Sequence, residues 1–277
     1  MSRLSGRFAD LRRRGRRGLV PFITAGDPSP SVTVPLMRRM VECGADVIEL
    51  GVPFSDPMAE GPTIQKACER ALAHGVRLHD VLDMVREFRS VDADTPVVLM
   101  GYLNPIEVMG YERFAQAAAQ AGADGVITVD MPPEEADDYV AALRGHGLDP
   151  VFLVSPTTTE ARMERISASS GGFLYYVSLR GVTGAGHLDI GEVGRKVAVI
   201  RRHTGLPVGV GFGISDAVSA ANVAGVADAV IVGSAIVKRV AAEHADADAL
   251  LDDVGAFVSE LRRAVDSADV PRAMENV

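Results

Sequence analysis

VIELGVPFSDPMAEGPTIQ, residues 47–65, joins a short apolar run to a loop that contains three prolines. An acid, Glu49, interrupts the run, and a second acid, Glu60, follows eleven residues later near the far end of the loop. A run without polar alternation is typical of a parallel strand that is covered on both faces. A carboxylate within such a strand would be buried, so its position in the fold needs an explanation.

Seven more apolar runs of this kind occur along the chain. The eight segments are LVPFITA from 19, DVIELGV from 46, PVVLMGY from 96, GVITVD from 125, PVFLVS from 150, FLYYVS from 173, PVGVGF from 207 and DAVIVG from 228. Amphipathic helical patterns separate them, as in 78–88 and 250–261. Eight strand–helix units predict a (β/α)8 TIM barrel. A doubly wound sheet is the alternative, but neither GxGxxG opening a helix nor GxxxxGK[ST] occurs.

We expect one barrel domain over residues 1–265, with an extra N-terminal helix, and a disordered C-terminal tail over 266–277. Two connections are longer than the rest, after the second strand (51–77) and after the sixth (179–190). The first has room for a helix of its own, and the second is Gly-rich. Beyond the strand–helix unit we find no internal repeat.

Composition excludes several classes of protein. The net charge of −9 argues against nucleic-acid binding. The one basic cluster, Arg12–Arg17, indicates a solvated helix end, with an anion or partner site as the alternative. The two cysteines and six histidines lack metal-site or disulfide spacing, so we expect no metal. The N-terminus has no apolar signal segment and no run of eighteen apolar residues occurs, so we expect a cytoplasmic protein without membrane contact.

The two acids are the candidate catalytic residues. Active sites of TIM barrels lie at the carboxyl ends of the strands. Glu49 is near such an end, where desolvation would raise the carboxyl pKa toward the range of a general acid. Glu60 can fold back over the same mouth, and two carboxylates can divide the proton transfers between them. The structural alternatives are an ion-paired Glu49 and a solvent-exposed Glu60.

Glycines after the last two strands predict a phosphate site. GFGIS at 211–215 and GSAIV at 233–237 supply Gly213, Gly233 and Ser234, and barrels often bind phosphate with these two loops. Gly184, in the 179–190 loop, could close over the site.

Aromatic residues predict how the rest of a substrate is held. Tyr175 is expected to point into the barrel and Tyr176 outward, while Phe22 and Phe212 could sandwich a flat apolar group. The residues thus indicate an enzyme for a small phosphorylated substrate that works by proton transfer. Isomerisation and retro-aldol cleavage both fit.

Several longer motifs occur in one order along the chain. They are LVPFITAGDP at 19–28, ELGVPFSDP and GPTIQ within 49–65, YLNP at 102–105, DMPPEE at 130–135, YYVSLRGVTG at 175–184, GFGIS at 211–215 and VGSAIVK at 232–238. In these motifs the chain resembles the tryptophan synthase α subunit family over residues 5–265. The resemblance implies a lyase that cleaves indole-3-glycerol phosphate into indole and glyceraldehyde 3-phosphate by a retro-aldol reaction.

The resemblance also implies a role for each site residue. Glu49 would protonate the indole ring carbon and then accept the hydroxyl proton, the acid at position 60 would bond the indole N–H, and Tyr175 would lie beside the reacting carbon. The remaining implied residues are Phe22, Tyr102 and Phe212 near the indole and glycerol parts, Thr183 ordering its loop over the site, and Gly184, Gly213, Gly233 and Ser234 on the phosphate. The family's α subunit uses no cofactor of its own and passes indole through a tunnel to a pyridoxal-phosphate-containing β subunit in an αββα assembly.

One departure concerns the second acid. The family usually has Asp where this chain has Glu60, which is longer by one methylene, about 1.5 Å of bond length. Since a misplacement near 1 Å can reduce a rate about 100-fold, we hypothesise that the loop lies slightly further back. The alternatives are a weakly catalytic or non-catalytic phosphate-binding regulatory subunit, a stand-alone lyase that releases indole, and another phosphate-binding barrel such as an isomerase.

Overall fold

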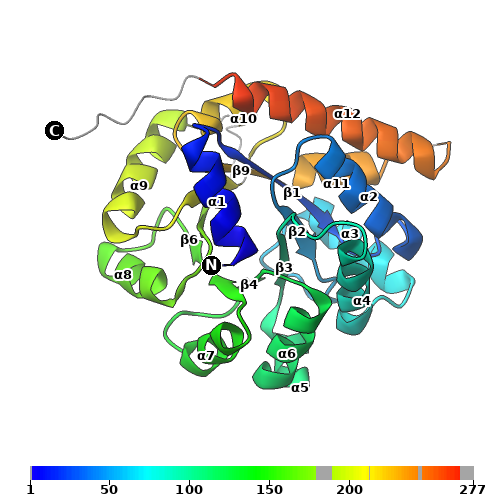
Figure 1. Cartoon of the computed structure of the whole chain (residues 1–277), viewed down its shortest axis with the longest axis horizontal. Helices are drawn as coiled ribbons and strands as arrows, with labels where there is room; N and C mark the ends of the chain where they lie inside the picture. The colour runs from blue at the N-terminus through cyan, green and yellow to red at the C-terminus, as the bar shows by residue number, and fades with distance from the viewer. Residues whose placement is uncertain (1, 179–188, 212, 243–244, 269–277) are drawn as a thin grey trace.

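A computed structural model describes residues 2–178, 189–211, 213–242 and 245–268 and shows a parallel β-barrel ringed by helices (Figure 1). Its strands are β1 (Gly18–Thr24), β2 (Ile48–Gly51), β3 (Val97–Gly101), β4 (Gly125–Thr128), β5 (Asp149–Val151), β6 (Leu153–Val154), β7 (Leu174–Val177), β8 (Val208–Gly211) and β9 (Ala229–Val232). The hydrogen-bonded order is β5-β4-β3-β2-β1-β9-β8-β7-β6, and every pair is parallel.

The barrel closes through a single segment that contains both β5 and β6. β5 pairs with β4, β6 pairs with β7, and only Phe152 separates the two. The carbonyl of Phe152 accepts a hydrogen bond of 3.1 Å from the backbone N–H of Tyr175, which continues the ladder. The prediction of eight barrel strands is confirmed, because β5 and β6 together are the predicted segment PVFLVS.

Helices cover the outside of the barrel (Figure 1). They are α1 (Arg3–Arg13), α2 (Pro30–Glu42), α3 (Pro62–Ala73), α4 (Leu78–Arg89), α5 (Leu103–Met109), α6 (Tyr111–Ala121), α7 (Asp137–Gly145), α8 (Glu160–Ser169), α9 (Ile190–His203), α10 (Ala217–Ala224), α11 (Ser234–Val240) and α12 (Ala247–Asp266). The long connection after the second strand holds α3, as predicted. None of the described helices is long and apolar enough to cross a bilayer.

The extra N-terminal helix closes the amino end of the barrel. Leu4, Phe8 and Leu11 of α1 are buried in the cluster that also contains the inward-facing Val20 and Val47. Figure 1 shows α1 inside the ring of outer helices. The amino end of the barrel is thus filled by apolar side chains of the described residues.

Alternation along the strands decides which side chains face inward. In β1, Leu19 and Ile23 pack in the outer cluster with the helices, while Val20 packs in the inner one. Successive side chains of a strand point to opposite faces, so Phe22 also faces the interior. Pairing aligns Phe22 with Glu49 of β2, which places the acid in the same layer. Tyr175 packs against the inner cluster and Tyr176 lies in the outer one, as predicted.

Three buried or half-buried aspartates join neighbouring strands at the amino end. Asp46, Asp124 and Asp228 each follow an alanine and precede β2, β4 and β9. Each carboxylate accepts a hydrogen bond from a backbone N–H in the first two residues of the adjacent strand, from Leu19, Val97 and Val208 at 2.9, 2.8 and 2.9 Å. This recurring Ala-Asp pair is a repeat within the strand–helix unit that the sequence analysis missed, and its signal was GAD at 44 and 122 and VAD at 226.

The same aspartates bind arginines. Arg262 of α12 donates to Asp46 at 2.8 Å, and both side chains are 8% exposed. Burial raises the pKa of Asp46, while the Leu19 N–H and Arg262 act to lower it. Because α12 ends at Asp266, which also binds Arg262, the helical part extends one residue beyond the predicted boundary at 265. Residues 269–277 of the predicted tail lie outside the described residues.

Arg262→Met should destabilise the fold by about 3 kcal/mol, because breaking a buried ion pair leaves the other charge without its partner. Urea unfolding at neutral pH would measure the loss. The matched control is Arg16→Met, which removes a half-exposed pair with Asp266 and should change the unfolding free energy by less than about 1 kcal/mol. Equal effects of the two substitutions would contradict a special role for the buried pair.

Candidate active site

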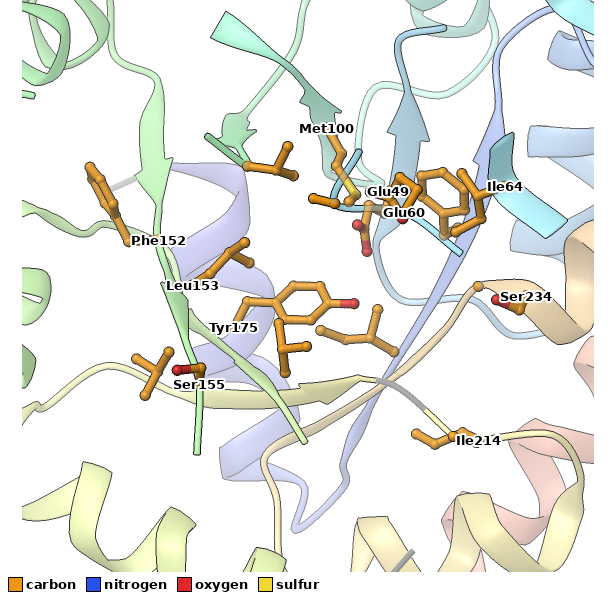
Figure 2. Close-up of a pocket in the computed structure, with 18 of the residues that line it drawn as sticks. Glu49, Glu60, Ile64, Met100, Phe152, Leu153, Ser155, Tyr175, Ile214 and Ser234 are labelled. Atoms are coloured by element: carbon orange, nitrogen blue, oxygen red, sulfur yellow. The ribbon is translucent and has the colours of Figure 1, made fainter. Parts of the chain in front are cut away.

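A cavity of about 1000 Å³ opens at the carboxyl end of the barrel. Glu49, Glu60 and Tyr175 line it, and so do Gly213, Gly233 and Ser234. Figure 2 shows the hydroxyl of Tyr175 pointing toward the two acids. The structure therefore brings together the three predicted catalytic residues in one cavity.

Glu49 is buried and forms no ion pair with any of the described residues. Its side chain leaves β2 toward the interior, is 1% exposed, and one carboxyl oxygen, Oε2, has no hydrogen-bond partner among the described residues. Burial raises the pKa of Glu49 to about 8, and the nearby Glu60 carboxylate contributes to the rise. A carboxylic acid with this pKa holds its proton at neutral pH and can donate it, which favours the catalytic interpretation over an ion-paired structural acid.

Glu60 reaches the same cavity from the loop between β2 and α3. Its side chain is half-buried, and burial raises its pKa to about 7. The side-chain amide of Gln65 donates to the backbone carbonyl of Glu60 at 2.8 Å and holds the end of the loop. The interpretation of Glu60 as a solvent-exposed loop acid is therefore wrong. Because Glu49 is buried more deeply than Glu60, a proton held by the pair is favoured on Glu49 at neutral pH.

Tyr175 occupies space that only glycine leaves free. A Cβ atom at Gly211 of the neighbouring strand would overlap the Tyr175 hydroxyl. In the same way, a Cβ at Gly51 would lie 2.6 Å from Cζ of Phe22. Burial raises the pKa of Tyr175, and the carboxylates of Glu49 and Glu60 add to the rise, so its hydroxyl stays protonated. Glycines in the barrel wall thus make room for the two inward aromatic rings.

Three of the four predicted phosphate residues, Gly213, Gly233 and Ser234, lie in the cavity wall. Gly213 follows β8 with a positive φ of 76°, and Gly233 is the N-cap of α11, which begins at Ser234. Gly213 and Ser234 are exposed. Glycine adopts a positive φ at little cost in free energy, so the backbone conformation at position 213 accounts for a glycine there. The arrangement presents the β8 and β9 loops to the same space.

An apolar wall faces the acids, and the sequence analysis identified only part of it. Phe22 packs with Ile64 of α3 and Met100 of β3, and Val129 and Leu153 line the same cavity. Because alternate side chains of a strand face the barrel interior, Met100 and Leu153 could have been predicted from the strand positions. Ile64 lies on a helix in the long loop, so its position depends on how that loop folds.

Of the predicted site residues, one lies away from the large cavity and three lie outside the described residues. Tyr102 does not line the large cavity. It lies behind the 52–61 loop, where its hydroxyl oxygen accepts a hydrogen bond of 2.9 Å from the backbone N–H of Ala59. Thr183, Gly184 and Phe212 lie outside the described residues, as does most of the predicted 179–190 loop. Within the described part of the chain, no group of three or more His, Cys, Asp or Glu side chains is arranged to hold a metal ion.

A parallel barrel with one buried and one half-buried acid of raised pKa at its carboxyl end defines a TIM-barrel enzyme suited to proton transfer. Comparison with known proteins is more specific. The family model described as Tryptophan synthase alpha chain matches residues 8–266. The chain therefore belongs to the tryptophan synthase alpha chain family.

Individual relatives agree with this assignment over nearly the whole chain. The tryptophan synthase alpha chain of Thioalkalivibrio sulfidiphilus is 61% identical and covers 96% of this chain and 100% of its own length. That of Nitrosococcus oceani is 58% identical, with 97% and 99% covered. The crystal structure of the alpha subunit from Legionella pneumophila superposes with a TM-score of 0.89 at 48% identity, covering 96% and 99%.

Family membership decides between the predicted classes of protein. The chain is a lyase of tryptophan biosynthesis. The alternative of an isomerase is wrong, and the alternative of a non-catalytic regulatory subunit is not supported.

Glu49→Gln should stabilise the protein at neutral pH. The folded-state pKa of Glu49 lies above the ordinary value of 4.5, so its stabilising contribution is complete below pH 4.5 and is lost as the pH rises toward 8. A neutral amide avoids that loss, and the variant should gain about 3 kcal/mol at pH 7. Urea unfolding at pH 5 and pH 7 would measure the difference.

The matched control for this prediction is Glu87→Gln on the exposed side of α4. Its effect on the unfolding free energy should be small and should not grow with pH. If Glu49→Gln gave no larger gain at pH 7 than at pH 5, the raised pKa of Glu49 would be refuted.

Proposed function

We propose that this chain cleaves indole-3-glycerol phosphate to indole and glyceraldehyde 3-phosphate by a retro-aldol reaction, without a cofactor of its own. The observation that carries the proposal is the pair Glu49 and Glu60 in one cavity, with pKa values of about 8 and about 7. Retro-aldol cleavage of this substrate needs one acid and one carboxylate at the same time, and the pair supplies both near neutral pH.

The first step is protonation of the indole ring. The indole lies against the apolar wall formed by Phe22, Ile64, Met100 and their neighbours. Glu49 donates its proton to the ring carbon that carries the glycerol chain, which makes the ring a cation. The carboxylate of Glu60 accepts a hydrogen bond from the indole N–H and stabilises that positive charge, as an ionised acceptor in a partly desolvated site can.

The second step breaks the carbon–carbon bond. Glu49, now a carboxylate, removes the proton from the hydroxyl group on the adjacent carbon. The O–H electrons form the aldehyde carbonyl, and the electrons of the breaking bond return to the ring, which restores neutral indole and leaves Glu49 protonated. Tyr175, whose hydroxyl points toward the acids (Figure 2), would lie beside the reacting carbon.

The phosphate group is held at the β8 and β9 loops. Backbone N–H groups of Gly213, Gly233 and Ser234 would donate to its oxygens, with Gly184 closing the site from the 179–190 loop and Thr183 ordering that loop. The exposed positions of Gly213 and Ser234 in the cavity wall support this role. We place Phe212 beside the indole by the resemblance alone, and Tyr102 acts from behind Glu60 rather than on the substrate.

The test is steady-state release of indole from indole-3-glycerol phosphate by the purified chain. The value of kcat/KM should fall as the pH rises through about 8, since Glu49 must be protonated, and as it falls through about 7, since Glu60 must be ionised. Because the acids interact, the two limbs belong to the pair. Glu49→Gln should lower kcat by about a thousandfold while the affinity for glycerol 3-phosphate is kept.

Glu60→Asp completes the same experiment. If the loop is adjusted to Glu, shortening the side chain should lower kcat, whereas a hundredfold increase would show that the longer acid is misplaced. An absence of indole release under every condition, with substrate still bound, would overturn the lyase proposal.

A β chain is the partner that we infer, in a cytoplasmic αββα complex whose β chain carries the pyridoxal phosphate. The support from this chain is an exposed apolar surface around the active-site mouth. Met58 of the 52–61 loop is 87% exposed and Val108 of α5 is 84% exposed. Phe54 of the loop stacks on Tyr102 with ring centroids 5.1 Å apart, which joins the loop to the start of α5. A groove of about 440 Å³ lies between Phe54 and Val108.

Val108→Asp should weaken the complex at least about tenfold, since a charge would be buried in the inferred docking surface. Indole release by the chain alone should not change, but its stimulation by a tryptophan synthase β chain should need a higher β-chain concentration. Val91→Asp is the matched control, because Val91 is exposed beyond the end of α4, at the amino end of the barrel. Full activity without any β-chain effect would instead indicate a stand-alone lyase.

A further inference from the structure

Thr24 has a buried hydroxyl group that no described residue hydrogen-bonds. The residue ends β1, is 2% exposed, and lies two positions after the inward-facing Phe22. Its side chain therefore faces the barrel mouth. Its Oγ1 atom has no partner among the described residues. A buried hydroxyl without a hydrogen bond costs free energy, so its surroundings need an explanation.

A small second cavity adjoins Thr24. Its volume is about 20 Å³, and it lies between the ends of β1–β3 and the 52–61 loop. Apolar atoms form most of its wall, but four polar side chains face it: Thr24, Glu60, Cys68 and Tyr102. A cavity of this size holds one water molecule, and a buried water needs two to four polar partners. The polar groups present match that requirement.

The donors and acceptors around this cavity are complementary. The oxygen of Tyr102 already accepts from the backbone N–H of Ala59 at 2.9 Å, so its proton is left to donate. Thr24 can donate or accept. Glu60 lines this cavity and the large active-site cavity alike, so a water in the small cavity lies beside the second acid. One water can accept from a hydroxyl and donate to the carboxylate.

We propose that Thr24 is a positioning residue for the second acid: with the Tyr102 hydroxyl it holds one water that hydrogen-bonds the Glu60 carboxylate. The inference rests on the proposed lyase function. The bridge sets how far Glu60 reaches toward the indole N–H, which matters because this acid is one methylene longer than the family's usual Asp. It also stabilises the ionised form of Glu60, since a hydrogen bond to a charged group is stronger than one between neutral groups.

Other titratable groups also face Glu60. Glu49 comes from β2, Tyr175 from β7, and Cys68 from α3. A substitution at Thr24 leaves Glu49, Tyr175 and Cys68 unchanged. Any shift in the titration of Glu60 can therefore be assigned to loss of the water bridge.

The test compares Thr24→Val, which keeps the shape and removes the hydroxyl, with Thr24→Ser, which keeps the hydroxyl. Loss of the bridge raises the pKa of Glu60, so the acid limb of kcat/KM should move up by about one pH unit in Thr24→Val. At about pH 6.5, kcat should fall about tenfold while KM changes less than about twofold. Thr24→Ser should restore the wild-type limb.

Two further variants keep the test decisive. Thr33→Val removes another buried hydroxyl, one that accepts from the backbone N–H of Gly26, and should destabilise the fold without moving the acid limb. Tyr102→Phe should move the limb in the same direction as Thr24→Val, and the double variant should shift it by less than the sum, because both act on one water.

An acid limb that is unchanged in folded Thr24→Val would overturn the inference. The inference and the lyase proposal fail separately, because the Glu60 titration can be followed by carboxyl carbon NMR without substrate. A wild type that releases no indole while Thr24→Val shifts the Glu60 titration would reject the lyase function and keep the contact. A wild type that releases indole while Thr24→Val leaves the Glu60 titration unchanged would keep the lyase function and reject the water bridge.

Discussion

Glu49 holds its carboxyl group inside the barrel at 1% exposure, and one of its oxygens has no partner among the described residues. Ionising such a group in a low-dielectric interior is costly. The cost is what keeps the proton on Glu49 at neutral pH, so the reactive acid is an intrinsically unfavourable element of the fold. The rest of the barrel must be stable enough to hold it there.

Carboxylates at the opposite end of the barrel have a different environment. Asp46, Asp124 and Asp228 are also carboxylates at strand ends, but each accepts a strand N–H and binds an arginine. Helix α1 fills the same end with apolar side chains. One type of functional group thus has two opposite environments: satisfied carboxylates stabilise the amino end, and the unsatisfied one gives the carboxyl end its chemistry.

Much of the fold and part of the site could be predicted from the sequence. Eight apolar runs without polar alternation were sufficient for a parallel barrel, and strand parity placed Tyr175 inward and Tyr176 outward. Family motifs such as ELGVPFSDP identified the lyase. The recurring Ala-Asp pair was visible in the sequence, but its meaning depends on which strand begins beside it. The contact of the Tyr102 hydroxyl with the 52–61 loop could not be predicted, because it depends on how that loop folds over the end of β3.

Local sequence determined what repeats with the backbone: the strands, the helices, the direction of each side chain, and the glycines at turns that need a positive φ, such as Gly213. Only the tertiary structure decided what depends on segments that meet in space. Arg262 and Asp46 are 216 residues apart in the chain, and the barrel closes through the single residue Phe152 between β5 and β6. Glu60 approaches Glu49 because the 52–61 loop folds back over the barrel mouth, and Thr24 faces Glu60 for the same reason. The pKa values that define the site follow from burial, and burial is a property of the packed molecule that no single segment carries.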